Sequence, residues 1–336
     1  MSASNLGPAH SLGDPAWLAL HDEPALLPAL EIIDPHFHLM GPPRTPYLAA
    51  DYAADLGDGH NVIGSVFLDC LQGYRTEGPE AFRPVGETEY AARVAAEHPK
   101  IATGIVSHVD LAIGAQARDV LEAHIEAGQG RFRGIRYASA HDPRDAVRSS
   151  MRARHARMLG EKAVREGIAT LAPLDLSLDL WLYHPQLQDA ADIASAYPDT
   201  RFILDHVGGP IGVGAYESER QAVFAQWRAG IREAARRPNL YVKLGGLGMA
   251  MCGFGFHTRA APPSSEALAE AWRPYIETCI EAFGPRRAMF ESNFPVDRLS
   301  CRYRTLWNAF KRIAQDASAD EQADLFAGAA KRAYKL

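Results

Sequence analysis

The alternation of short apolar runs with longer amphipathic segments constrains the fold of this chain most strongly. The runs are rich in Ile, Val, Leu and Phe and occupy residues 30–33, 62–68, 101–106, 132–137, 178–182, 201–204, 240–244 and 287–290. They show little polar–apolar alternation, which is typical of parallel strands that are covered on both faces. The sequence therefore predicts eight parallel strands.

Helical segments separate these runs, and proline or glycine marks most of their ends. We expect helices at residues 87–98, 115–127, 186–197, 217–236 and 265–283, with two more at 305–315 and 319–333. Repeated strand–helix alternation is typical of parallel α/β proteins. Because no GxGxxG motif follows the first run, a (β/α)8 TIM barrel is favoured over a doubly wound open sheet. We expect one barrel domain over residues 28–336, preceded by an N-terminal extension over residues 1–27.

The charge pattern argues against nucleic-acid and membrane partners. The chain has 336 residues and a net charge of −6, with positive and negative residues interspersed. Such a pattern offers no basic surface for a polyanion. The richest basic stretch, residues 144–157, is interrupted by acidic and apolar residues and is interpreted as a solvated helix face.

The cysteines and the N-terminal sequence predict a cytoplasmic protein. The four cysteines form no CxxC pair, which suits a reducing compartment. The first 30 residues lack the basic-then-apolar layout of a signal peptide. No apolar run approaches the roughly 18 residues that would indicate a membrane span.

The motif DPHFH at residues 34–38 directly follows the first apolar run. Residues two apart in extended chain point the same way, so His36 and His38 would project together into the mouth of a barrel. Neutral imidazoles are good ligands for divalent metals. The alternative is a pair of polar histidines in a loop.

Two further histidines follow later runs. His184 comes after the fifth run and His206 after the sixth, and in a barrel the C-terminal ends of the strands carry the catalytic residues. Either histidine alone would as easily bond a neighbouring loop. Together with the first pair they indicate a metal site.

Several longer motifs carry a resemblance to a known family. They are IDPHFH at 33–38, YRTEGPEAFRPVGETEY at 74–90, FRGIRY at 132–137, LDHVGGP at 204–210, YVKLGGL at 241–247 and MFESNFPVD at 289–297. In this order they resemble the amidohydrolase superfamily, in particular the branch that contains sugar-lactone and 2-pyrone-4,6-dicarboxylate lactonases. The resemblance covers roughly residues 30–300.

The resemblance implies a distorted (β/α)8 barrel that hydrolyses a lactone, ester or amide through an activated water. It also implies a divalent metal (Zn, Mn or Fe), which lowers the pKa of that water and polarises the carbonyl. His36 and His38 match the first-strand ligands, His184 the fifth-strand histidine and His206 the sixth-strand histidine, which we also count as catalytic. Some lactonases of this branch work without a tightly held metal.

The eighth strand departs from the family pattern. Relatives usually read GSDWP there, with the Asp as proton shuttle and metal ligand, whereas this chain reads ESNFP at residues 291–295. Asn293 takes the Asp position, and a neutral amide cannot accept a proton from water. We therefore expect Glu291 to be a metal ligand and catalytic carboxylate, with Asn293 orienting water or substrate. Asp297, grouped with the substrate contacts, is the other acid that can reach back.

The remaining polar candidates concern the substrate. Arg75 and Arg136 are predicted to grip an anionic group, since guanidinium binds carboxylate in a bidentate manner. Ordinary salt bridges are the alternative for both. Tyr137 is assigned to the wall of the substrate pocket. Lys243 is interpreted as a buried partner of Asp205.

The sequence predicts a metal-assisted hydrolase that acts on a small anionic, carboxylated or polyhydroxylated lactone, ester or amide. Two rival hypotheses stay open. One is a non-heme, dinuclear iron oxygenase on the same barrel, because histidine and carboxylate ligands also suit iron. The other is a binding barrel without catalysis, suggested by the missing Asp. Homo-oligomerisation is left open.

Overall fold

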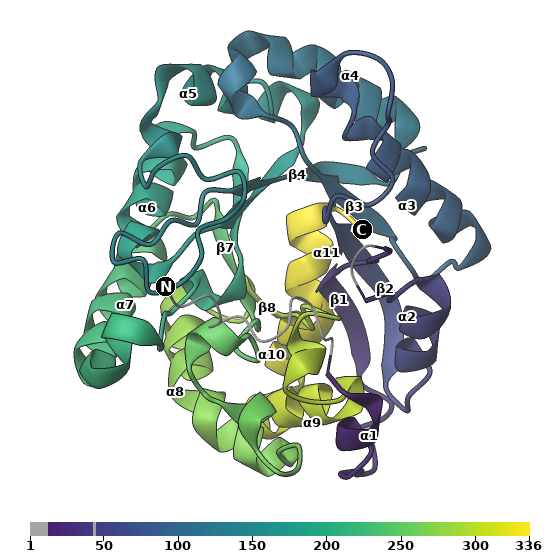
Figure 1. Ribbon diagram of the computed structural model, residues 1–336, viewed down its shortest axis with the longest axis vertical. Coiled ribbons are helices and arrows are strands. Elements are labelled where there is room, and N and C mark those ends of the chain that lie inside the picture. The colour runs from purple at the N-terminus through teal and green to yellow at the C-terminus, as the bar shows by residue number, and fades with distance from the viewer. Residues whose placement is uncertain (1–12, 43–44) are drawn as a thin grey trace.

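The computed structural model describes residues 13–42 and 45–336 and consists of one parallel barrel (Figure 1). Residues 1–12 of the expected extension lie outside the described residues. The strands pair in chain order, parallel throughout: β1 Glu31–Phe37, β2 Asn61–Leu68, β3 Gly104–Ser107, β4 Phe132–Ala138, β5 Ser177–Trp181, β6 Arg201–Leu204, β7 Leu240–Leu244 and β8 Ala288–Phe290. Each expected run overlaps one strand. The predicted (β/α)8 barrel is confirmed.

The ring closes between β8 and β1 just beyond the end of β8. Phe37 and Phe294 form a parallel bridge, and the His38 amide donates to the Phe294 carbonyl at 2.7 Å. The Asn293 amide likewise donates to the His36 carbonyl at 2.9 Å. The two histidines and the eighth-strand motif are therefore held together by backbone hydrogen bonds.

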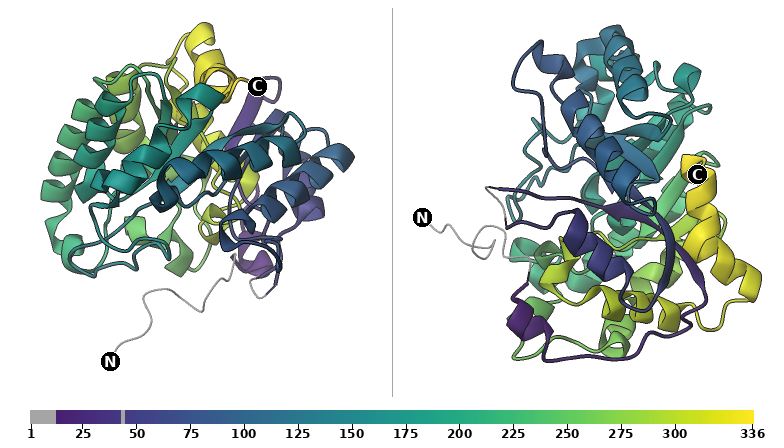
Figure 2. Two further views of the ribbon diagram at one scale, coloured as in Figure 1. Left: turned by 90° about the horizontal axis from the view of Figure 1, so that it is seen from above. Right: turned by 90° about the vertical axis from the view of Figure 1, so that its right-hand side faces the viewer.

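Helices surround the strands, as Figures 1 and 2 show. Their bounds are α1 Pro15–Leu18, α2 Ala49–Leu56, α3 Val85–Glu97, α4 Ala117–Ala127, α5 Lys162–Ile168, α6 Leu187–Ala196, α7 Arg220–Ala234, α8 Ser265–Phe283, α9 Tyr303–Ile313, α10 Ala319–Ala323 and α11 Ala329–Tyr334. The sequence pattern did not indicate the short helices α2 and α5. The helix expected at 319–333 is divided by a π-helical turn, Asp324–Gly328, that contacts β1 and β8.

One expectation about this layer was wrong. Residues 144–157 form turns and bends rather than a solvated helix. None of the helices in the described residues is long and apolar enough to cross a membrane.

The barrel interior has an apolar floor below a polar layer. Inner-facing residues of the strands pack against the last helix: Ile33, Val66, Val106, Ile203 and Met289 meet Ala330, Ala333 and Tyr334 of α11. The Tyr334 hydroxyl then donates to Asp179 on β5 at 2.6 Å. The polar layer thus begins directly above α11, further along the strands toward their C-terminal ends.

A bulge in β1 decides which side chains enter the barrel. Three steps along β1, from Asp34 to Phe37, correspond to two steps along β2, so the alternation of faces is reset. Asp34 and Phe37 consequently both meet Tyr52 of α2, outside the barrel: the Tyr52 hydroxyl donates to Asp34 at 2.8 Å, and its ring stacks on Phe37. His36 and His38 are left pointing inward.

Candidate active site

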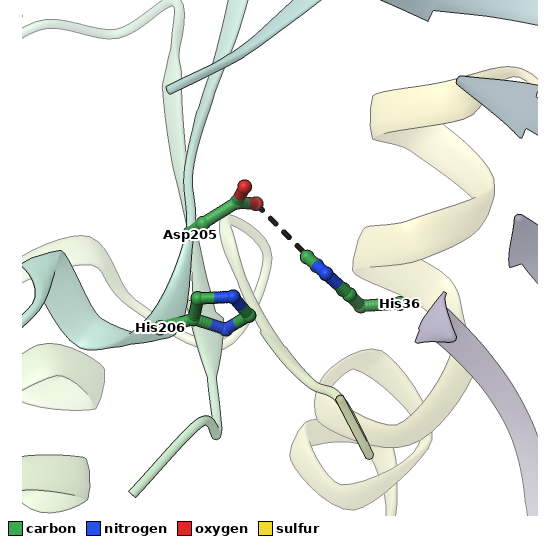
Figure 3. A group of neighbouring side chains, drawn as sticks. All are labelled: His36, Asp205 and His206. Carbon is green, nitrogen blue, oxygen red and sulfur yellow. Dashed lines mark ion pairs between the residues drawn. The ribbon is translucent and has the colours of Figure 1, made fainter. Parts of the chain in front are cut away.

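Strand ends on opposite sides of the barrel bring five polar residues together, here called the histidine cluster. Its members are His36, His38, Asp205, His206 and Glu291, and each is at most 4% exposed. Figure 3 shows His36 extending from one side toward Asp205 and His206 on the other. The structure thus unites residues from β1 and from the segments just beyond β6 and β8.

The imidazoles of His36 and His38 face each other through their Nε2 atoms, and Nε2 of His36 donates to Nε2 of His38 at 3.2 Å. Nδ1 of His38 donates to the Leu68 carbonyl at 2.9 Å, because a carbonyl can only accept. Burial lowers the pKa of both rings, that of His38 to about 3 with help from the positive charge of Arg136. Both rings are therefore neutral near pH 7, the state in which imidazole binds metals.

Glu291 lies on the Nδ1 sides of two rings. One carboxylate oxygen accepts from His206 Nδ1 at 2.7 Å and from the His206 amide at 3.1 Å. The other lies 3.0 Å from His36 Nδ1. Burial alone would raise the pKa of Glu291, but His206 and His36 outweigh it and hold the pKa at about 2. Glu291 is thus an ionised carboxylate that holds the His206 imidazole by a hydrogen bond and lies close to that of His36.

The turn after β6 is strained where it presents His206. His206 and Val207 have φ values of 54° and 47°, and a side-chain-bearing residue in this left-handed region costs on the order of 1–3 kcal/mol. The His206 amide is anchored on Glu291, and Trp227 donates to the Val207 carbonyl at 2.7 Å. Strain of this kind persists at functional sites because the surroundings fix it.

Three glycines in the loop after β7 make room for the polar side chains. A Cβ on Gly245 would lie 2.5 Å from Glu291 Cγ, and one on Gly246 would lie 2.5 Å from His206 Cβ. A Cβ on Gly248 would meet Asp297 at 2.9 Å. The GG pair of the YVKLGGL motif and the glycine that follows it were signals of this crowding that the sequence analysis did not use.

Asn293 and Asp297 form a second contact beyond β8. Asn293 has a φ of 53° and donates through Nδ2 to Asp297 Oδ1 at 2.9 Å. Asp297 Oδ2 accepts from the Gly248 amide at 3.0 Å. Burial raises the pKa of Asp297 to about 7, against the opposing effect of the Gly248 amide. The loop carboxylate therefore does reach back to Asn293.

Beside the histidines, Asp69, Tyr74, Arg136 and Arg152 form what we call the arginine cluster. Arg136 Nε donates to Asp69 Oδ1 at 2.8 Å, and Arg152 donates to Asp69 Oδ2 and to the Tyr74 hydroxyl, both at 2.6 Å. Burial would raise the pKa of Asp69, but the two guanidinium groups keep it well below its usual range. Sequence reasoning missed Arg152, because the basic stretch that contains it was interpreted as solvated.

Three expected site residues make their contacts with residues outside the histidine cluster. Arg75 is 40% exposed and pairs with Glu89 of α3, as an ordinary surface salt bridge. Tyr137 packs in the apolar layer between strands and helices, because neighbouring residues of β4 face opposite ways and Arg136 takes the inner side.

His184 is the third of these residues. Its Nδ1 accepts from the Ile211 amide at 3.3 Å, and its ring stands edge-on to Tyr216, 5.2 Å away. The grouping of residues at metal-ligand separation includes neither His184 nor His38. Nε2 of His184 is buried and has no hydrogen-bond partner among the described residues, so a metal ligand at His184 stays a prediction.

A buried lysine lies beneath the histidine cluster. Lys243 Nζ is 2.9 Å from Asp205 Oδ1, which agrees with the interpretation of Lys243 as a partner of Asp205. It also donates to Asp179 at 2.6 Å and lies 3.0 Å from His36 Nδ1. Within the described residues, His36, Asp205 and His206 offer ligand atoms that all lie within 4.8 Å of one another.

Comparisons with known proteins agree with this architecture. The family model for amidohydrolases matches residues 33–336. An uncharacterized protein, y4mH, of Sinorhizobium fredii is 31% identical over 91% of this chain and 99% of its own length. An L-fucono-1,5-lactonase of Burkholderia multivorans is 27% identical over 90% of this chain and 96% of its own.

A solved structure extends the likeness to the fold. The crystal structure of an amidohydrolase from Burkholderia multivorans with bound zinc superposes with a TM-score of 0.64 at 24% identity, covering 91% of this chain and 99% of that one. The family match spans the barrel, the histidine cluster and the eighth-strand motif alike. The chain therefore belongs to the amidohydrolase family of hydrolases.

Proposed function

We propose that this protein is a divalent-metal hydrolase that opens a small lactone carrying a carboxylate or several hydroxyl groups. The observation that carries the proposal is the pair of neutral imidazoles, His36 and His38, whose Nε2 atoms face each other at 3.2 Å. Two nitrogens bound to one tetrahedral zinc at about 2.0–2.1 Å lie about 3.3 Å apart. The spacing of the two histidines already fits a shared cation.

The surroundings of the two rings also fit a metal. One carboxylate oxygen of Glu291, 3.0 Å from His36 Nδ1, is buried and accepts no hydrogen bond among the described residues. An ammonium can only donate, so the Lys243 contact at 3.0 Å places the His36 proton on Nε2. A cation at Nε2 would displace that proton to Nδ1, where this oxygen could accept it. We assign His36 and His38 as ligands, with His206 as the third, and zinc or manganese as the metal. The bound cation would supply a water of lowered pKa and a polarised carbonyl.

We assign the proton transfers to Asp297. A carboxyl group with a pKa near 7 is a suitable general base near neutral pH. Asp297 accepts the proton as water oxygen bonds the lactone carbonyl carbon, and returns it to the ring oxygen as that C–O bond breaks. The product is the open hydroxy acid. Asn293 holds Asp297 in place by donating a hydrogen bond to it, and does not itself transfer protons.

The arginine cluster is assigned to the polar substituents of the substrate. Arg136 is largely buried beside His38, and Arg152 is 24% exposed on the loop after β4. Without substrate, both guanidinium groups donate to the carboxylate of Asp69. A substrate carboxylate or vicinal hydroxyl pair would compete for the same donors.

A lactone panel assayed by proton release tests the proposal. The panel includes L-fucono-1,5-lactone and 2-pyrone-4,6-dicarboxylate, the compounds named for the relatives and for structural neighbours of this chain. We expect hydrolysis of at least one member, lost on chelation and restored by Zn²⁺ or Mn²⁺. Ligand binding without turnover by the metal-loaded protein would favour the binding barrel instead. Oxygen consumption with bound iron would favour the oxygenase.

A further inference from the structure

The ammonium of Lys243 lies among side chains that could otherwise hold a cation. The residues at metal-ligand separation are His36, Asp205 and His206, yet Lys243 Nζ lies 2.9 Å from an oxygen of Asp205 and 3.0 Å from His36 Nδ1. A third contact, at 2.6 Å, ties the same nitrogen to Asp179. The ammonium is therefore surrounded by ligand atoms contributed by β1, β5 and the end of β6.

The burial of these groups makes their charge balance important. Asp179, Asp205, Glu291 and Lys243 are all 0% exposed. A buried charge without an opposite charge beside it destabilises the protein, because no ion pair offsets the free energy lost when the charge leaves water. The three carboxylates are balanced by one ammonium and one divalent cation. Within this set of side chains, a second divalent cation would leave two positive charges in excess.

We infer that Lys243 is a built-in cation that restricts this barrel to a single divalent metal, held on the Nε2 side of His36 and His38. The inference rests on the proposed metal-dependent function and extends it to the number of ions. It also argues against the dinuclear oxygenase, because the position of the second iron is taken by the lysine side chain.

The position of the single ion follows from the two sides of the His36 ring. Its Nδ1 side holds Lys243 at 3.0 Å and Glu291 at 3.0 Å. Its Nε2 side faces only the Nε2 of His38 among the partners found for it in the described residues. His38 contributes nothing to the Nδ1 side, so its removal discriminates between the two positions.

Manganese stoichiometry tests this inference directly. Chelator-stripped protein is titrated with Mn²⁺, and bound ion is counted by elemental analysis and by electron paramagnetic resonance. We expect wild type to saturate at one ion per chain with an uncoupled spectrum. His38→Ala should weaken binding at least tenfold. Two ions per chain in wild type, or unchanged affinity in His38→Ala, would overturn the inference.

Removal of the lysine charge provides the complementary arm. Lys243→Ala frees the position, and we expect a second Mn²⁺ with a spin-coupled signal. Lys243→Gln keeps most of the volume and is the alternative should the alanine variant not fold, as judged by circular dichroism. One ion in a folded variant would contradict the role of Lys243. Wild type that binds no Mn²⁺ at all would overturn the metal assignment too, whereas a mononuclear protein without lactone turnover would refute only the substrate.

Discussion

The histidine cluster and the arginine cluster meet at the same end of the barrel but are built differently. His36, His206 and Glu291 stand on strands or within two residues of a strand end, and all are at most 4% exposed. In the arginine cluster, Arg152 comes from a long loop and is 24% exposed. The sheet fixes the first cluster and also Arg136 on β4, whereas the position of Arg152 depends on the loop. We therefore expect the first to determine metal binding and turnover, and the second to determine substrate affinity.

The largest effect should follow from removing both first-strand imidazoles. The double variant His36→Ala, His38→Ala is expected to lose most of its bound metal and all measurable turnover, because each ring supplies one nitrogen of the proposed site. Metal content by elemental analysis and the thermal unfolding midpoint provide the measurement. Full metal content in the folded double variant would show that both rings are structural.

Asp297→Asn should lower turnover by about 10²–10⁴-fold, the usual contribution of a general base. Metal content should stay unchanged, since Asp297 is not an assigned ligand. The base must be ionised to accept a proton, so kcat/KM of wild type should rise with pH through about 7 and then level off. That rise should disappear in the variant. A variant that retains the pH profile would exclude Asp297 as the base.

The difference between the two clusters also explains what the sequence could predict. Strand alternation located the inward pair on β1 and Glu291 near β8, because period-two geometry carries over from sequence to structure. The bulge in β1 was not predicted, although it turns the His36 side chain into the barrel. Without it, simple alternation would have placed Asp34 and His36 on the same side.

The contacts made by loop residues could not be predicted from the sequence pattern. Arg152 donates a hydrogen bond to Asp69, which is 83 residues away in the sequence. No local periodicity indicates such a contact. The contacts of Tyr137 and Arg75 were not predicted for the same reason, since position in a motif does not tell which face a side chain takes or which surface partner it bonds. His184 follows β5, but its ring turns toward Tyr216.

Glu291→Gln should separate positioning from catalysis. The amide is uncharged and keeps only one accepting oxygen beside His206 and His36, so we expect metal affinity to fall about 10–100-fold, as for other carboxylates behind ligand histidines. Saturating metal should then restore most of the turnover. Turnover that stays absent in the fully loaded variant would instead identify Glu291 as a base, as the sequence first indicated.

The smallest effect, and the sharpest test of the comparison, concerns Arg152. Losing one hydrogen-bonded contact to a charged substrate group should cost about 1.5–3 kcal/mol of binding. Arg152→Met should therefore raise KM by about 10–150-fold, with kcat and metal content near wild type, since 1.4 kcal/mol corresponds to a factor of ten. Arg75→Met is the matched control, because the Arg75–Glu89 pair is exposed and lies outside both clusters. Its KM should not change. If Arg152→Met lowered kcat and left KM unchanged, the loop arginine would act in the transition state, and the division between the two clusters would fail. If Arg75→Met raised KM as much as Arg152→Met, the substrate would extend to α3, and the arginine cluster would not be the anchor.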